Sequence, residues 1–129
     1  MTHKSRLGTI CIDCKTDDLP AALAYWSAAL GRPGKLDPGG KYAEIAPVEG
    51  EPIVILQAVD HDSRVHLDIE TDDKAAEVAR LEALGAKVVA EIQTWIVMEA
   101  PTGHRFCVVN PQRADFAEKA PPAGGETAG

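Results

Sequence analysis

The feature that most constrains the fold of this chain is an internal repeat of about 55 residues. The acidic pair Asp17–Asp18 recurs as Asp72–Asp73, and each pair precedes a helix-like segment that ends in Leu-Gly. One strand-like segment comes before each helix and three come after it. A supersecondary unit that occurs twice in one chain predicts two similar modules. We therefore expect an α+β fold built from two β-α-β-β-β modules.

The first module is expected at residues 7–59. In Leu7–Cys14 the β-branched Ile10 and Ile12 alternate with Cys11 and Asp13, which is the period of a strand. The next segment is a helix with apolar residues at spacings of three and four on one face, namely Leu19, Leu23, Trp26 and Leu30. It ends at Gly31. Three short strands come next, around Lys35 and at residues 42–46 and 53–59.

The second module is expected at residues 64–111. Val65–Glu70 alternates strictly between apolar and polar side chains, as a strand with one wet face does. The next helix has Val78, Leu81 and Leu84 on one face and ends at Gly85. Strands are expected at residues 87–92, 94–98 and 105–109. Residues 114–129 are rich in Ala, Pro, Gly and Glu, so we expect a disordered tail there.

Charge and cysteine content exclude several classes of protein. The net charge is −7 and the basic residues form no stripe, which argues against a nucleic-acid or anionic-membrane partner. No apolar stretch approaches the ~20 residues that span a bilayer. Three cysteines are an odd number for a disulfide framework. We expect no secretion signal, because residues 1–6 run directly into a strand-like segment without an apolar h-region. A cytoplasmic protein with reduced thiols is the simplest interpretation.

Three stretches carry a resemblance to a known superfamily: Asp18–Gly31, His66–Asp73 and Pro101–Val109. In their order and spacing they resemble the glyoxalase / bleomycin-resistance / extradiol-dioxygenase (vicinal oxygen chelate) superfamily, and in particular a bacterial glyoxalase-like branch. The resemblance covers Leu7–Pro111 and implies one glyoxalase-like domain over residues 1–113. It also implies a mixed sheet curved into a bowl around a cavity, with the helices on the convex side.

The resemblance implies positions for metal ligands as well. Metal-dependent members place one ligand on the first strand and one on the last strand of each module. These positions correspond to Cys11 and His66 on the opening strands and to Cys107 on the last strand. The fourth falls at Val54, with Gln57 as the nearest polar residue. Two sulfurs and an imidazole would favour zinc.

Polar residues of the alternating strands are the expected lining of the cavity. The predicted ligand-binding residues are His66, Asp68, Trp95 and Gln57. Four acidic residues are candidates for a general base, namely Glu44, Asp68, Glu70 and Glu99. Each of them has the alternative interpretation of a solvated strand residue.

The spacing Cys11-x-x-Cys14 invites a redox or zinc-knuckle interpretation. Those motifs need a helix N-terminus or a turn, whereas both cysteines lie in a predicted strand. A separation of three residues points them to opposite faces. We therefore expect neither a disulfide nor a knuckle here, and a small core residue is the default for Cys107.

Three hypotheses for function remain open. The first is a lyase, isomerase or dioxygenase-type enzyme that uses a divalent metal. The second is a metal-free protein that sequesters a small molecule such as an antibiotic, as bleomycin-resistance proteins do. The third is a non-catalytic partner domain. In each case the superfamily implies a small organic ligand with adjacent oxygens, and open sheet edges predict a homodimer.

Overall fold

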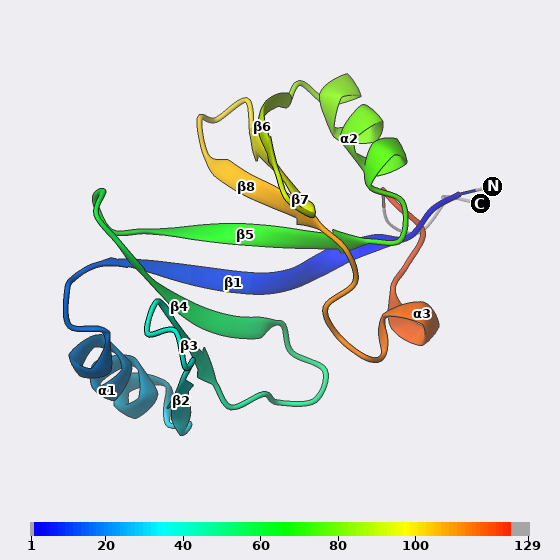
Figure 1. Cartoon of the computed structure of the whole chain (residues 1–129). Coiled ribbons are helices and arrows are strands. Elements are labelled where there is room, and N and C mark those ends of the chain that lie inside the picture. The colour runs from blue at the N-terminus through cyan, green and yellow to red at the C-terminus, as the bar shows by residue number, and fades with distance from the viewer. Residues whose placement is uncertain (1, 125–129) are drawn as a thin grey trace. The chain divides into compact units, whose positions relative to one another are not determined.

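The computed structural model describes residues 2–124 of the chain (Figure 1). Its Cα positions group into two compact units. The first unit is residues 9–66, and the second is formed by residues 2–8 together with 67–124. The start of the chain therefore belongs with the second unit, which the expected module boundaries of 7–59 and 64–111 did not anticipate.

The first unit contains a strand, a helix and three further strands. These elements are β1 (Ser5–Lys15, whose first residues lie in the second unit), α1 (Leu19–Leu30), β2 (Gly34–Leu36), β3 (Tyr42–Ile45) and β4 (Ile53–Val59). The strands lie in the order β2-β3-β4-β1, with β1 parallel to β4 and the other neighbours antiparallel.

The second unit repeats this connectivity and adds one helix. Its elements are β5 (Arg64–Thr71, whose first residues lie in the first unit), α2 (Lys74–Ala83), β6 (Lys87–Ile92), β7 (Trp95–Glu99), β8 (Arg105–Val109) and α3 (Phe116–Lys119). The order is β6-β7-β8-β5, with β5 parallel to β8 and the other neighbours antiparallel. The predicted α+β fold of two β-α-β-β-β modules is confirmed.

Both long helices begin at the predicted caps, and α1 ends at the predicted Gly31, whereas α2 ends at Ala83 with Leu84 as its C-cap, one residue before the predicted Gly85. The side chain of Asp18 accepts a hydrogen bond from the backbone N–H of Ala21, and Asp73 does the same for Ala76. These N-caps satisfy amide groups that have no partner within the helix. Gly31 ends α1 with a φ of 69°, a conformation that glycine adopts at little cost.

The core of the first unit lies between α1 and one face of its strands. The buried residues are Cys14, Leu19, Ala43, Ile45 and Leu56, with Leu23 and Trp26 packed against them. In the second unit Leu81, Met98 and Val108 form the corresponding cluster, with Val78 beside it. Each predicted apolar stripe extends beyond the residues that pack in the core. Leu30 and Leu84, at the ends of the two stripes, are 43% and 66% exposed.

The segment after residue 113 differs from the disordered tail that its composition predicts. Helix α3 is ordered, and its Phe116 is buried beneath the guanidinium of Arg6. Asp115 Oδ1 lies 2.5 Å from Arg6 Nη2, and an isolated β-bridge joins Lys4 to Pro122. Composition misleads here because one aromatic residue and one ion pair anchor the segment. The rest of the predicted tail, residues 125–129, lies outside the described part.

Glu70 ties together three parts of the second unit. Its side chain is fully buried and accepts hydrogen bonds from Arg6 Nε at 2.6 Å, Arg113 Nε at 3.1 Å and the backbone N–H of Gln112 at 2.6 Å. Burial alone would raise the pKa of this carboxyl, but the hydrogen bonds outweigh burial and hold the pKa below its usual value. Glu70 therefore links β5, the start of β1 and the chain after β8.

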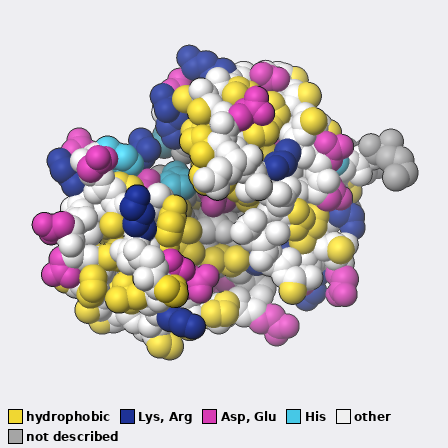
Figure 2. All heavy atoms as spheres, viewed as in Figure 1, with side chains coloured by type: hydrophobic (Ala, Val, Ile, Leu, Met, Phe, Trp, Pro, Cys, Tyr) yellow, Lys and Arg dark blue, Asp and Glu magenta, His cyan; other side chains and the backbone are white. Residues whose placement is uncertain are grey.

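Among residues 2–124, no helix is both long and apolar enough to cross a bilayer. On the face shown in Figure 2, Lys and Arg side chains are scattered among acidic ones.

Replacing Phe116 with Ala should lower the free energy of unfolding by about 3–5 kcal/mol, the usual cost of deleting a buried aromatic ring. Urea denaturation of F116A measures this effect. The matched control is Glu118→Ala on the exposed side of the same helix, which should change stability little. Equal stability of F116A and wild type would contradict the burial of Phe116 in the folded protein.

Replacing Glu70 with Gln should cost about 3–5 kcal/mol, because it leaves two arginines facing a site without a buried negative charge. The folded pKa of Glu70 lies below its unfolded value of about 4.3. The contribution of Glu70 to the free energy of unfolding is therefore fully present above that value and is lost as the pH falls through the folded pKa. Denaturation at pH 3–7 should show acid destabilisation that is weaker in E70Q.

The control is Glu99→Gln, because Glu99 pairs with Arg105 and Lys87 at the surface rather than in the core. Its loss of stability should be much smaller. A stability loss in E70Q no larger than that in E99Q would contradict the structural role of Glu70.

Candidate functional site

The strands of the first unit present two chemically different faces. Along β1, Ile12 and Cys14 face α1 and its core, whereas Cys11 and Asp13 point to the other face. Both of these polar-face side chains are buried, with exposures of 1% for Cys11 and 2% for Asp13. A thiol and a carboxylate are thus held out of water on the face opposite to α1.

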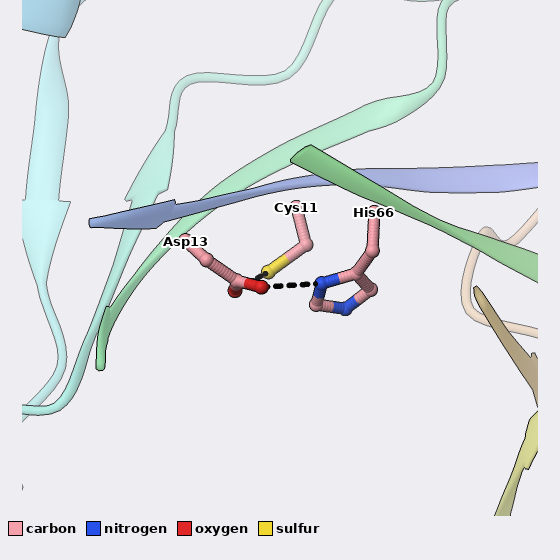
Figure 3. A group of neighbouring side chains, drawn as sticks. All are labelled: Cys11, Asp13 and His66. Carbon is pink, nitrogen blue, oxygen red and sulfur yellow. Dashed lines mark hydrogen bonds and ion pairs between the residues drawn. The ribbon is translucent and has the colours of Figure 1, made fainter. Parts of the chain in front are cut away.

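Cys11 and Asp13 meet His66, which lies on β5, at a common point (Figure 3). His66 Nδ1 is 2.9 Å from Asp13 Oδ2, and the Cys11 thiol donates to Asp13 Oδ1 at 3.5 Å. The imidazole is 16% exposed, so it is the most accessible of the three groups. Arg64, half-exposed at the start of β5, brings Nε to 3.4 Å from the same Asp13 Oδ2. We call these four residues the Asp13 cluster.

A polar row continues from the Asp13 cluster across the neighbouring strands. Gln57 of β4 is the register partner of Asp13, and its Oε1 lies 3.8 Å from Cys11 Sγ. Tyr42 of β3 is in turn the register partner of Gln57, whose Nε2 donates to its hydroxyl at 3.4 Å. The predicted ligand-binding residue Gln57 therefore lies between the cluster and Tyr42.

The polar row leads to a pocket of about 340 Å³. Its lining residues come from β2, the β2–β3 turn, β3 and β4, namely Lys35, Leu36, Asp37, Pro38, Tyr42, Glu44 and Ile55. Ile55 is the register partner of both Glu44 and Cys11, so the pocket opens on the face of the strands that carries the cluster. Its volume lies within the range of small-molecule sites.

The remaining predicted site residues lie in the second unit. Asp68 on β5 is the register partner of Cys107 on β8, and both are partly buried. Trp95 begins β7 and is also partly buried. The proposed roles of Cys107 as a metal ligand and of Asp68 and Trp95 in ligand binding stay predictions.

The strand register corrects one of the positions assigned by motif. Asp13 pairs with Gln57 as Asp68 pairs with Cys107, so Gln57 is the counterpart of Cys107 in the first module. Val54, the position chosen from the sequence, packs against the core under α1. The error arose because an apolar run such as Ile53-Val54-Ile55-Leu56 gives no signal for the register of its strand.

Asp13 and Arg64 are the two members of the cluster that sequence reasoning missed. The signal for Asp13 was present, since it lies two residues after Cys11 and shares its face. No comparable signal identified Arg64, whose contact with Asp13 depends on the placement of β5 beside residues of β1.

The structure separates the candidates for a general base. Glu70 is occupied by the two arginines described above, and Glu99 forms surface ion pairs with Lys87 and Arg105. Glu44 is exposed and lines the pocket. Of these three carboxylates, Glu44 has the position from which it could take a proton from a bound molecule.

A single metal ion could be held by Cys11, Asp13 and His66. One sulfur, one carboxylate oxygen and one imidazole nitrogen of these residues lie within 4.8 Å of one another. Thiolate and imidazole are ligands that zinc accepts, and carboxylate suits zinc and harder divalent ions. The donor set therefore fits a divalent transition metal.

Comparisons with known proteins agree with the motifs. A family model described as a glyoxalase-like domain matches residues 9–109. No curated protein matches the sequence at a significant level. The resemblance to the vicinal-oxygen-chelate superfamily is confirmed.

Solved structures of similar fold come from several bacteria. A hypothetical protein from Bacillus halodurans C-125 is 10% identical with a TM-score of 0.59, over 84% of this chain and 96% of that chain. The Mn(II)-bound glyoxalase of Novosphingobium aromaticivorans is 18% identical with a TM-score of 0.60, over 94% of this chain and 46% of that chain. Methylmalonyl-CoA epimerase of Streptomyces coelicolor is 16% identical with a TM-score of 0.54, over 84% and 95%. At these identities the likeness is one of fold.

The folded protein should keep three reduced thiols after exposure to air, because Cys11 and Cys14 point to opposite faces. Burial, with the nearby charge of Asp13, raises the pKa of the Cys14 thiol, which also slows its oxidation. A thiol assay after denaturation without reductant measures the count. A count of one, restored to three by reductant, would contradict the facing of these residues.

Proposed function

We propose that this chain, which belongs to the glyoxalase-like domain family, binds a divalent metal ion through Cys11, Asp13 and His66. We propose further that it acts, as a lyase or isomerase of glyoxalase type, on a small organic molecule with adjacent oxygens. The observation that carries the proposal is the convergence of a buried thiol, a buried carboxylate and an imidazole on the strand face that bears a pocket. Zinc is the ion that this donor set favours.

Different residues of the first unit would hold the metal and orient the substrate. Cys11, Asp13 and His66 would hold the metal, which when bound would act as a Lewis acid on a substrate oxygen. The polar row of Gln57 and Tyr42 offers hydrogen bonds to a molecule that extends from the cluster toward the pocket. Strand spacing places Tyr42 roughly 10 Å from Asp13, which is a span suited to a small molecule.

Glu44 is the residue that we propose as the proton acceptor. It lines the pocket, and its register partners on the neighbouring strands are Lys35 and Ile55. A carboxylate that is open to the pocket can take a proton from a carbon next to a carbonyl and return it, which is the step that an isomerase or lyase of this type needs. Gln57 and Tyr42 would fix the orientation of the molecule while this happens.

A second function, metal-free binding of a small molecule, is favoured by one specific observation. Arg64 already lies 3.4 Å from Asp13, so this carboxylate has a cationic partner without a metal. In that case the pocket and the polar row would bind an uncharged or weakly polar molecule. The homodimer predicted from the sequence is compatible with either function and stays a prediction.

Purified, untagged protein should bind about one zinc ion per chain, and His66→Ala and Cys11→Ser should each abolish or strongly weaken binding. Equilibrium dialysis followed by elemental analysis measures the stoichiometry. The matched controls are His61→Ala, an exposed histidine of the same unit, and Cys14→Ser, a cysteine of the same strand that faces the core. Both should bind zinc like the wild type.

Binding of zinc that is equally weak in all five proteins would contradict the metal site. In that case, a small molecule that raises the melting temperature of the wild-type protein would favour the binding function. Gln57→Leu or Tyr42→Phe should then reduce this rise.

A further inference from the structure

We propose that Arg64 is a specificity residue that is paired with Asp13 in the absence of a metal. Once a metal occupies Asp13, Arg64 recognises a carboxylate of the substrate. This inference rests on the proposed metal site and narrows the substrate class to small organic anions. It starts from a feature that metal binding alone does not explain, namely a guanidinium placed against a candidate metal ligand.

Two groups of the cluster share one oxygen atom of Asp13. Asp13 Oδ2 has His66 Nδ1 at 2.9 Å and Arg64 Nε at 3.4 Å. Asp13 is 2% exposed, so its charge is largely removed from water and needs a partner. A metal ion bound to this carboxylate would repel the positive guanidinium and replace it as that partner.

The partners of Asp13 change when a metal binds. Without a metal, Asp13 Oδ2 has the guanidinium of Arg64 beside the imidazole of His66. A divalent cation on this carboxylate would take the place of the guanidinium. Arg64 would then stand without its carboxylate at the half-exposed edge of the cluster, where the carboxylate of a ligand could pair with it.

Arg64 also has the mobility and chemistry that this role needs. Its side chain is 51% exposed, so it can leave Asp13 without breaking the packing of the core. The planar guanidinium can form two parallel hydrogen bonds with a carboxylate, which a lysine cannot do. His66, by contrast, is 16% exposed and lies closer to Asp13, at 2.9 Å.

Zinc affinity, measured by competition with a chromophoric chelator, tests the first half of this proposal. Arg64→Met should bind zinc roughly three- to fivefold more tightly than wild type, which is the scale of one partly exposed ion pair. The control is Lys15→Met, which removes the same charge from the same unit at a residue that pairs with Asp62 rather than with the cluster. It should bind zinc like the wild type.

Acetate binding by metal-free protein, followed by NMR at constant ionic strength, tests the second half independently. Asp13→Asn should free Arg64 and bind acetate roughly threefold more tightly than wild type. The double variant with Arg64→Met should lose that gain.

The outcomes separate this inference from the proposed function. Equal zinc affinity of R64M and K15M would overturn the competition even if zinc binds as proposed. If neither the wild type nor any variant binds zinc, the metal function fails and the release of Arg64 by a metal fails with it. If zinc binds, an acetate gain in D13N that needs Arg64 would support the anion role, and no gain would overturn it.

Discussion

The parallel pairing of β1 with β4 is the constraint on which the candidate site depends. Its register sets Asp13 beside Gln57 and Cys11 beside Ile55, while the alternate residues of both strands pack under α1. A shift of β1 by one residue along β4 would turn Asp13 into the apolar core and Ile12 onto the polar face. The core therefore fixes the site, because the same pairing decides which side chains are buried under the helix and which meet His66.

Much of the fold could be predicted from the sequence because its signals are local and occur twice. The acidic caps, the glycine stops and the alternation of Ile10 to Asp13 each specify one element, and the repeat joins them into modules. Composition failed after residue 113, because the burial of Phe116 against Arg6 is a long-range contact. No average over neighbouring residues can detect such a contact.

The candidate site was only partly predictable for the same reason. Cys11, His66 and Gln57 were identified from motifs and alternation, and the structure places all three around Asp13. Asp13 itself was overlooked because acidic residues on a wet strand face are common, although its burial distinguishes it from them. Arg64 and the correct counterpart of Cys107 required the strand register, which an apolar run does not reveal.

The central claim is that one sulfur and one imidazole of the first unit share a metal ion with Asp13. X-ray absorption at the zinc edge of the loaded protein tests it most directly, because sulfur scatters differently from nitrogen and oxygen. Zinc held by these ligands should give a sulfur shell near ~2.3 Å and a nitrogen and oxygen shell near ~2.0–2.1 Å. Any zinc that Cys11→Ser still binds should show no sulfur shell, and Cys14→Ser should give the spectrum of the wild type. A zinc spectrum that is the same in wild type and Cys11→Ser would contradict the account.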